Sequence, residues 1–423
     1  MIKKLHTDPY KGTRDFYPED MAIQRYIFDT WSKSAELFGY ERYDASILEP
    51  SELYKSKGAE NEEMVNEQTY TFTDRGEREV TLRPEMTPSV ARMVAARKRE
   101  LTFPVRWYAI PNLFRYERPQ RGRLREHWQL NCDIFGVDDI SADVESIALA
   151  HSVLTSFGAT PDTFQIHIND RALMESWYAH TFHLDSDSIR AVTRIVDRRK
   201  KVSGAEFKMM LGAIVPDTDR LIEGLNATDP NTLGEKTELS KIIDALKELK
   251  ITNVVFDASL ARGFDYYTGT VFEIFDTSSE NSRSLLGGGR YDNLTQLFGG
   301  DALSGVGFGV GDVVMRDFLE THKLLPTDIH VTAPTLILIP TDGAYHTRAQ
   351  SLASEFRSLG IRTAVDITDK KLAKKIGTAC DKGAGFVIVL GGDEVIKHTY
   401  TLKNLKTKEE FTGLPVTIAK HIS

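Results

Sequence analysis

The sequence is poor in cysteine and has no long hydrophobic run. Only two of its 423 residues are cysteines, Cys132 and Cys380, and they are far apart in the chain. This spacing excludes a disulfide framework and the usual metal-ligand clusters, so we expect a reducing compartment and no metal site. No stretch approaches the roughly 20 apolar residues that a transmembrane helix needs. The composition is that of a globular protein without a membrane segment.

Positive charge is also scarce overall. The chain has 53 lysines and arginines against 61 aspartates and glutamates, which gives a net charge of −8. This balance argues weakly against a general nucleic-acid coat, although a local basic patch can still bind phosphate. The first residues, MIKKLHTDPYKG, contain two lysines with no apolar segment after them, so we expect no secretory signal and a cytoplasmic location.

The hydrophobic pattern changes twice along the chain, which is long enough for two or three domains. A helix is predicted over 23–38, and the short β-rich runs that follow predict an α+β fold on a largely antiparallel sheet. A helical, charge-rich stretch interrupts this pattern, and alternating strands and helices follow a proline-containing linker. The predicted domains are a sheet domain over 1–168 and 250–325, a helical insertion over 169–249 and an α/β domain over 333–423.

Arginine is concentrated in one segment, FRYERPQRGRLREHWQLNCDIFG, from Phe114 to Gly136. Both FRYER and HWQLNCDIF have strand character, and side chains two apart in a strand share a face. Gln129, Asn131 and Asp133 then line a polar face opposite an apolar one. The arginine-rich loop between the strands is either a solvated hairpin tip that opposes aggregation or a clamp for phosphate oxygens.

Three further segments contain residues suited to a binding site. TLRPEMTPSVARM holds Glu85 and Thr87 after a short strand, although a helix-capping pattern explains it nearly as well. LARGFDYYTGTVFEIF places an arginine and an aspartate, which are costly to bury unpaired, beside two tyrosines. LLGGGRYDNL and GVGFGVGD repeat glycine within strand patterns, which leaves room for a ligand or another backbone. The glycine rows predict the floor of a pocket.

These segments together resemble the histidyl-tRNA synthetases, a family of class II aminoacyl-tRNA synthetases. RYERPQRGRLREHWQ resembles the second class-defining motif, and ARGFDYYTGTVFE is similar to the histidine-specific signature. GGGRYDNL with GVGFGVG resembles the stretch that leads into the third motif. The resemblance runs from KGTRDFYPEDM to DKGAGFVIVLGGDE. It implies an antiparallel six-stranded catalytic sheet with flanking helices, a helical insertion domain, a C-terminal anticodon-binding α/β domain and a homodimer.

The activity implied by the resemblance is that of a histidine–tRNA ligase. The carboxylate of L-histidine attacks the α-phosphate of ATP to give histidyl-adenylate and pyrophosphate. The ribose at the 3′ end of tRNA(His) then takes the histidyl group, and AMP leaves. ATP is a substrate that comes with Mg²⁺. No covalent enzyme nucleophile is needed, so positioning and charge stabilisation carry most of the rate.

Matching motif positions implies roles for individual residues. Arg115 and Arg262 match the catalytic arginines at the α-phosphate, and Arg262 stands where other class II enzymes place a metal. The positions that match the ATP site are Arg115, Glu117, Arg123 and Arg262. Those that match the histidine site are Glu85, Thr87, Gln129, Asp133, Tyr266, Tyr267 and Tyr291. A carboxylate with tyrosine hydroxyls satisfies both the donor and the acceptor of a neutral imidazole. Arg118 and Gln120 match the tRNA acceptor-end contacts.

Two motifs depart from the family pattern. The third motif usually has a glutamate and an arginine after its glycine row, but Val313 and Val314 stand there, so the arginine that touches ATP is missing. Arg316 follows two residues later and points elsewhere if the segment is a helix. Ser46 stands where the first motif has a proline that shapes the dimer contact. The sequence leaves open what replaces the arginine.

Several interpretations stay open at this point. A catalytically silent paralogue that regulates histidine biosynthesis or senses tRNA is the alternative function, although such relatives typically lack the anticodon domain or have lost motif residues. A different class II synthetase is a third possibility, against which DYYTG argues. A lysine group at helical spacing either contacts the anticodon stem or forms a solvated helix face. Its members are Lys370, Lys371, Lys374 and Lys375.

Overall fold

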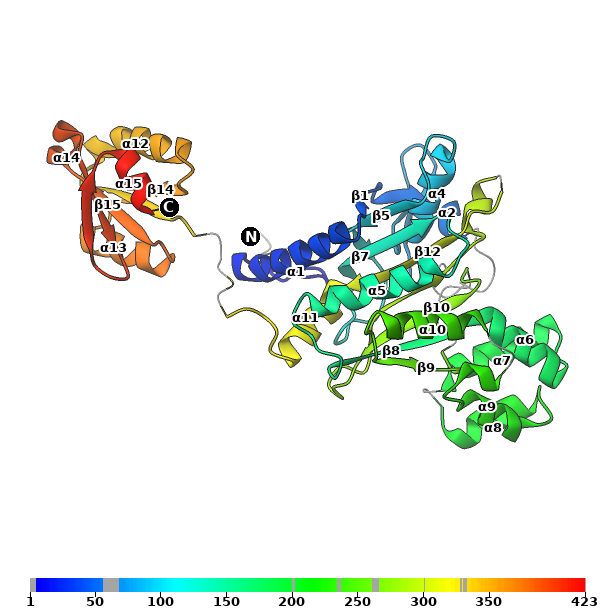
Figure 1. Cartoon of the computed structure of the whole chain (residues 1–423). Coiled ribbons are helices and arrows are strands. Elements are labelled where there is room, and N and C mark those ends of the chain that lie inside the picture. The colour runs from blue at the N-terminus through cyan, green and yellow to red at the C-terminus, as the bar shows by residue number, and fades with distance from the viewer. Residues whose placement is uncertain are drawn as a thin grey trace. The chain divides into compact units, whose positions relative to one another are not determined.

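The computed structural model of the chain divides into two compact units (Figure 1). The larger unit comprises residues 1–16 and 23–327, and the smaller consists mostly of residues 328–423. The residues described are 5–55, 68–199, 202–233, 237–260, 266–299, 301–327, 329 and 333–422. Within these ranges, no helix has the length and apolar character needed to cross a membrane.

The larger unit is built on one extended sheet. Its six central strands, in spatial order, are β5 (Val105–Ala109), β7 (Glu126–Phe135), β12 (Gly305–Gly311), β11 (Ser284–Arg290), β10 (Thr270–Asp276) and β8 (Phe164–Asp170). Each neighbouring pair among them is antiparallel. Two short strands lengthen the edges in parallel: β1 (Glu41–Arg42) joins β5, and β9 (Val254–Phe256) joins β8. The predicted antiparallel six-stranded sheet is confirmed.

One face of this sheet is the apolar core. The helices α1 (Pro18–Leu37), α5 (Ser141–Thr155) and α11 (Asp312–Thr321) lie over this face (Figure 1). Their apolar side chains belong to the same buried cluster as strand residues of β7. Leu130, Cys132 and Ile134 of β7 are at most 2% exposed and belong to this cluster. The predicted alternation of β7 is therefore confirmed, and its polar side chains lie on the opposite face.

Smaller elements complete this unit. A three-stranded sheet has the order β2 (Leu48–Pro50), β4 (Glu79–Leu82) and β3 (Tyr70–Thr73). Other described elements of this unit are α2 (Glu52–Lys55), α4 (Thr87–Arg97), the 3₁₀ helix η4 (Leu294–Phe298) and β6 (Asn112–Phe114), which pairs with β7.

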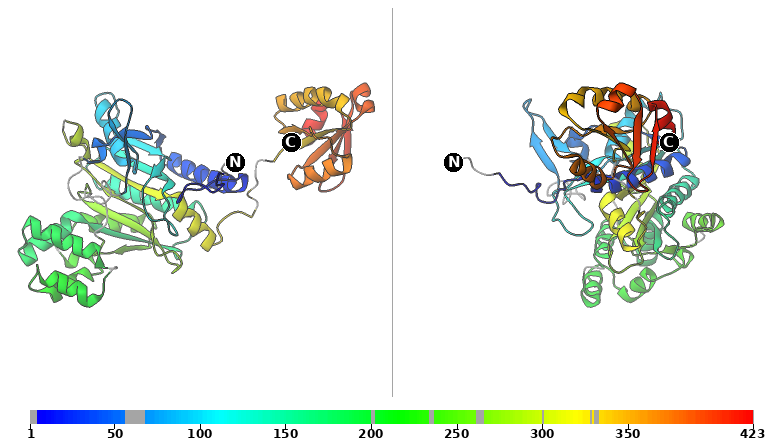
Figure 2. Two further views of the ribbon diagram at one scale, coloured as in Figure 1. Left: turned by 180° about the vertical axis from the view of Figure 1, so that it is seen from behind. Right: turned by 90° about the vertical axis from the view of Figure 1, so that its left-hand side faces the viewer.

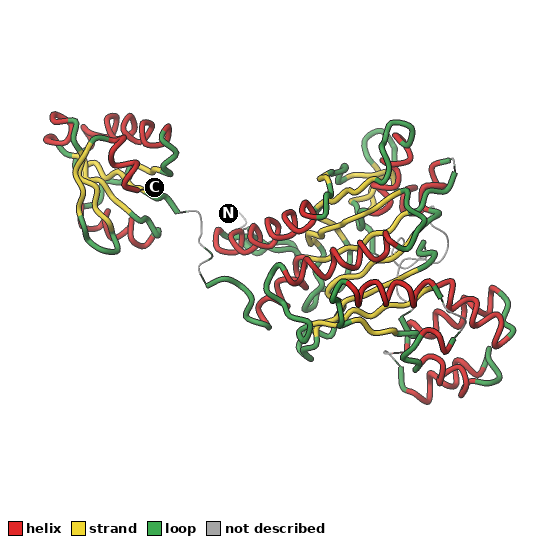
Figure 3. The backbone as a smooth tube through the Cα atoms, in the orientation of Figure 1, coloured by secondary structure: helices red, strands yellow, loops and turns green. Residues whose placement is uncertain are grey.

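Helices fill the chain between β8 and β9, as the sequence predicted (Figure 3). They are α6 (Arg171–Phe182), α7 (Ser186–Asp197), α8 (Gly204–Gly212), α9 (Thr218–Leu225), the 3₁₀ helix η3 (Pro230–Thr232) and α10 (Glu238–Glu248). Each α-helix among them begins after an Asp, Ser or Thr whose side chain accepts a hydrogen bond from a first-turn N–H. This capping explains where the helices start. Their status as a separate insertion domain over 169–249 stays a prediction.

The smaller unit is a five-stranded sheet with helices on both faces (Figure 2). Its strands, in spatial order, are β14 (Thr363–Val365), β13 (Leu336–Pro340), β15 (Phe386–Leu390), β16 (Tyr400–Asn404) and β17 (Glu410–Gly413). Its helices are η5 (Gly343–Tyr345), α12 (His346–Ser358), α13 (Leu372–Asp381), α14 (Gly392–Lys397) and α15 (Pro415–Ile422). The first three strands are parallel, as expected for the α/β pattern, whereas β16 and β17 add antiparallel strands that the sequence analysis did not anticipate.

The lysine group of this unit does not form one solvated helix face. Lys375 is buried, and its Nζ donates a hydrogen bond to the Pro340 carbonyl at 3.1 Å and lies 3.7 Å from Asp366. Lys370 and Lys371 precede α13. The interpretation of all four lysines as one helical surface is therefore wrong, because the face of α13 that includes Lys375 packs against the sheet.

Candidate active site

The polar face of β7 lies beside the glycine row of β12. Gly307 pairs with Asp133, and Gly309 pairs with Asn131. A Cβ on Gly307 would lie 2.4 Å from Oδ1 of Asp133, and one on Gly309 would lie 2.4 Å from Nε2 of Gln129. Any larger residue would displace these polar groups, so glycine is needed here for space.

A carboxylate and three tyrosines form a cluster above this floor. The ring centroids of Tyr266 and Tyr267 are 5.0 Å apart, and those of Tyr266 and Tyr291 are 5.7 Å apart. The Tyr291 hydroxyl donates a hydrogen bond to Oδ1 of Asp133. The Tyr266 hydroxyl donates to Oε2 of Glu85 at 3.3 Å and also bonds to the side chain of Thr87. All of these residues are among those predicted for histidine binding.

Asp133 retains an unused acceptor. The residue is 2% exposed, and within the described part of the chain its buried Oδ2 has no hydrogen-bond partner. Burial raises the pKa of Asp133 from 3.8 to about 7, and the hydrogen bond from Tyr291 partly opposes this rise. A buried acceptor without a partner is costly, and a ligand N–H removes that cost.

The arginine-rich hairpin brings three of the four predicted ATP residues together. Nε of Arg115 donates to the Pro84 carbonyl at 2.8 Å, and its burial lowers the pKa of the guanidinium. Glu117 is buried and forms an ion pair with Arg123. Arg115, Glu117, Arg123 and Gln129 all line a cavity of about 270 Å³ that also reaches the glycine floor at Gly309.

FRYER is not a strand throughout, contrary to the sequence prediction. The strand β6 ends at Phe114, and the N–H of Tyr116 donates to the Gln68 carbonyl at 2.7 Å instead of continuing the ladder. The adjoining loop leads into a second cavity of about 720 Å³, lined by Gln120, Arg121 and Arg123 among others. Arg118 is exposed and lines neither cavity.

Arg262 cannot be placed in this arrangement, because it lies outside the described residues. Across the residues that are described, no group of three or more His, Cys, Asp or Glu could hold a metal ion.

Two polar residues of the site were missed by the sequence analysis. His127 lines the smaller cavity; its Nδ1 is buried, and burial together with Arg115, Arg14 and Arg123 lowers the pKa of the imidazole to about 3. Its place two residues before Gln129 on the same strand face was the available signal.

Asp312 is the other missed residue, and it is fully buried at the start of α11. Its carboxylate lies 2.7 Å from Nη2 of Arg14, and it accepts hydrogen bonds of 2.9 Å from Gln24 and from the Trp128 N–H. Through these contacts Asp312 links the N-terminal segment, α1 and β7 to the start of α11.

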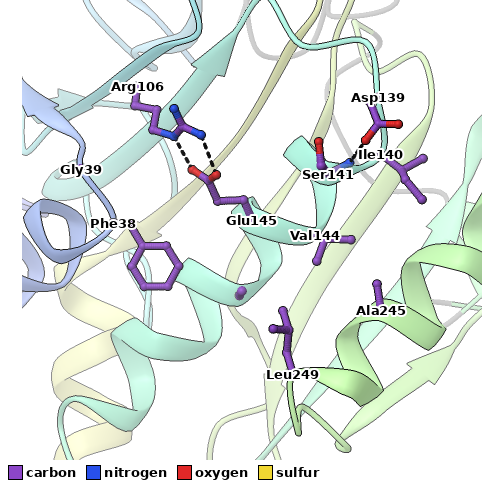
Figure 4. A pocket seen from close by; sticks show the side chains of 11 residues that line it. Phe38, Gly39, Arg106, Asp139, Ile140, Ser141, Val144, Glu145, Ala245 and Leu249 are labelled. Carbon is purple, nitrogen blue, oxygen red and sulfur yellow. Dashed lines mark hydrogen bonds and ion pairs between the residues drawn. The ribbon is translucent and has the colours of Figure 1, made fainter.

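A third cavity, of about 630 Å³, contains none of the predicted site residues (Figure 4). Phe38, Val144 and Leu249 contribute apolar side chains to its wall. Arg106 donates to Glu145 through Nε at 2.6 Å and through Nη2 at 2.8 Å. We assign this cavity no part in the candidate active site.

Comparison with known proteins matches both units. A protein-family model described as histidyl-tRNA synthetase matches residues 12–311, and one described as anticodon binding domain matches residues 335–420. The histidine–tRNA ligase of Leptospira biflexa is 41% identical over 424 residues, which cover 97% of this chain and 96% of the relative. That of Thermoplasma volcanium is 38% identical and covers 96% of each chain.

Solved structures agree on the fold. The crystal structure of histidyl-tRNA synthetase from Nostoc sp. PCC 7120 aligns with a TM-score of 0.78 at 22% identity over 99% of both chains. The apo enzyme from S. aureus aligns with a TM-score of 0.74 at 24% identity over 99% of this chain and all of the other. At these identities the structures support the fold alone, whereas the family models and the sequence relatives identify the family. The chain belongs to the histidyl-tRNA synthetase family.

Proposed function

We propose that the chain is a histidine–tRNA ligase. It activates L-histidine with ATP and transfers the histidyl group to the 3′ end of tRNA(His), with release of pyrophosphate and AMP. Family membership over nearly the full length supports the reaction type. The buried, partly unpaired carboxylate of Asp133 beside three tyrosines is the observation that supports histidine as the amino acid.

The imidazole of histidine occupies the cluster above β7. Its N–H donates to Oδ2 of Asp133, and a tyrosine hydroxyl, that of Tyr267, donates to the other ring nitrogen. A substrate side chain that lacks this donor and acceptor leaves buried groups of the site unpaired. The site therefore discriminates against such a substrate far more strongly than a simple apolar pocket does. Glu85, Thr87 and Gln129 hold the amino and carboxylate groups of the substrate.

ATP occupies the cavity beside the arginine hairpin. Arg115 contacts the α-phosphate, and its bond to the Pro84 carbonyl fixes the guanidinium before the substrate arrives. Because the site is buried, this preorganised charge acts strongly on the developing charge at phosphorus. Glu117 contacts the adenine side and Arg123 the outer phosphates, while Arg262 also acts at the α-phosphate. Mg²⁺ enters as part of the MgATP substrate.

The proposal extends to partners and location. Arg118 and Gln120 contact the acceptor end of tRNA(His), and the C-terminal domain over 333–423 binds the anticodon region. A homodimer is supported by exposed Leu48 and Phe72 in the β2–β4–β3 sheet near the first motif, where Ser46 is also exposed. The cytoplasm is the proposed location.

The alternative of a silent regulatory paralogue is not favoured. A structure described as an ATP phosphoribosyltransferase regulatory subunit/histidyl-tRNA synthetase, from Bacillus halodurans, has a TM-score of 0.74 at 22% identity, so the fold does not separate the two functions. The match to an anticodon-binding domain over residues 335–420 and the presence of Arg115, which is held by the Pro84 carbonyl, both favour the ligase.

Histidine-dependent exchange of pyrophosphate into ATP tests the proposal. The purified chain should catalyse exchange with L-histidine and not with other amino acids. No exchange with any amino acid would contradict the enzyme assignment, and exchange with another amino acid alone would contradict the substrate. Arg262→His should lower exchange by orders of magnitude with an unchanged circular dichroism spectrum; near-normal exchange would refute the role of Arg262.

A further inference from the structure

Arg283 lies at the entrance to the nucleotide side of the site. It directly precedes β11 and lines both the 270 Å³ cavity and the 720 Å³ cavity. Within the described part of the chain, its guanidinium makes no hydrogen bond or ion pair. By contrast, Arg115 bonds to the Pro84 carbonyl and Arg123 pairs with Glu117. Arg283 is therefore a cation that can bind a ligand without breaking an existing contact.

The stem of Arg283 lies beside the valine that replaces the third-motif arginine. A Cβ on Gly122, at the tip of the hairpin, would lie 3.2 Å from both Cδ of Arg283 and Cγ1 of Val314. A Cβ on Gly311 would lie 3.6 Å from Cγ2 of Val314 and 3.9 Å from Cδ2 of His127. Arg283 and Val314 therefore both approach Gly122, and all three of Arg283, Val314 and His127 line the 270 Å³ cavity.

We propose that Arg283 binds ATP by stacking its guanidinium on the adenine, in the space beside Val314 and His127. This inference rests on the proposed ATP-dependent function. A planar guanidinium stacks well on flat rings. The imidazole of His127 is neutral at physiological pH and adds a second flat surface without charge repulsion toward Arg283. Arg283, in the loop between β10 and β11, thereby supplies the positive charge that the third-motif arginine would provide.

Arg283→Ala tests the assignment through the Michaelis constants of pyrophosphate exchange. We expect the KM for ATP to rise about 10- to 100-fold, because this is the range for the loss of a charge-assisted contact. The KM for histidine should change less than about 2-fold. Arg283→Lys, which keeps the charge but cannot stack, should recover little of the loss. If the alanine variant has the same KM for ATP as the wild type, the inference is wrong. If the lysine variant has that KM, Arg283 does not stack on the adenine.

A matched control and a rescue separate binding from folding. Arg316 lies on the same helix as Val314, but its Nε bonds to Glu320 at 2.9 Å and it lines neither cavity, so Arg316→Ala should leave the KM for ATP unchanged. Adding Val314→Arg to Arg283→Ala should restore most of the lost affinity. Failure of this rescue, with an unchanged melting temperature, would count against a shared adenine subsite.

Calorimetric titration with ATP in the absence of histidine distinguishes this inference from the proposed function. If the wild-type chain binds ATP and Arg283→Ala binds it more weakly, Arg283 is a nucleotide ligand even if no amino acid supports exchange. Equal dissociation constants for the two proteins would overturn the inference while leaving histidine activation intact.

Discussion

Asp133→Asn tests the buried carboxylate through the pH dependence of stability. In the folded chain burial holds the pKa of Asp133 at about 7, whereas in the unfolded chain it returns to its ordinary value of 3.8. Below pH 4 both states carry the proton, so the folded state bears no penalty. Between pH 4 and 7 the unfolded state releases the proton first, so this residue lowers the stability of the wild type as pH rises.

The magnitude follows from the two pKa values. One pKa unit equals about 1.4 kcal/mol, so the difference amounts to about 4 kcal/mol between pH 4 and pH 8. Asparagine cannot titrate and removes this slope. The unfolding free energy of Asp133→Asn, relative to the wild type, should therefore rise by up to about 4 kcal/mol across this window, equivalent to several degrees in melting temperature.

Differential scanning calorimetry of both proteins from pH 4 to pH 8, without histidine, measures this difference. Tyr291→Phe is the companion variant, because it removes the hydrogen bond that opposes the raised pKa and should move the window to higher pH. Parallel melting-temperature profiles for the wild type and Asp133→Asn would refute the reasoning. At pH 8, histidine should stabilise the wild type and have much less effect on Asp133→Asn.

Other substitutions test buried contacts around the site and in the smaller unit. Asp312→Ala removes the buried carboxylate that pairs with Arg14 and accepts hydrogen bonds from Gln24 and Trp128, so urea denaturation should show a loss of about 1–3 kcal/mol; an unchanged midpoint would contradict this. Gly307→Ala places a methyl group 2.4 Å from Oδ1 of Asp133 and should reduce histidine-dependent exchange about 10- to 100-fold, whereas Gly377→Ala, with open space around it, should not. Lys375→Ala should lower the melting temperature of the smaller unit while leaving exchange unchanged, and a loss of exchange would contradict that separation.

Backbone periodicity explains what could be predicted from the sequence. The alternation of β7 placed Gln129 and Asp133 on one face because a period of two is a property of any strand. The glycines of β12 predicted a floor because a strand without side chains leaves space above it. The order of the elements followed from apolar spacing in the same way, so a largely antiparallel sheet and the α/β pattern near the C-terminus were recovered, whereas the number of six strands came from the resemblance to the family.

Contacts between distant segments explain what could not be predicted. Asp312 and Arg14 are 298 residues apart, and no local pattern indicates that they pair. The strand prediction for FRYER failed because the backbone N–H of Tyr116 bonds to the distant Gln68 carbonyl instead of a partner strand. Helical spacing placed Lys375 on a face but could not show that this face is buried against the sheet.

Arg283 illustrates why a missing motif residue does not by itself remove a function. A motif assigns a chemical group to a position in the chain, but the substrate responds to where that group lies in space. Val314 and Arg283 belong to different elements, yet both lie within contact distance of the same point at Gly122. A guanidinium from the residue before β11 can therefore serve the cavity that a guanidinium from α11 would serve, because electrostatic attraction and stacking depend on distance and orientation and not on sequence position.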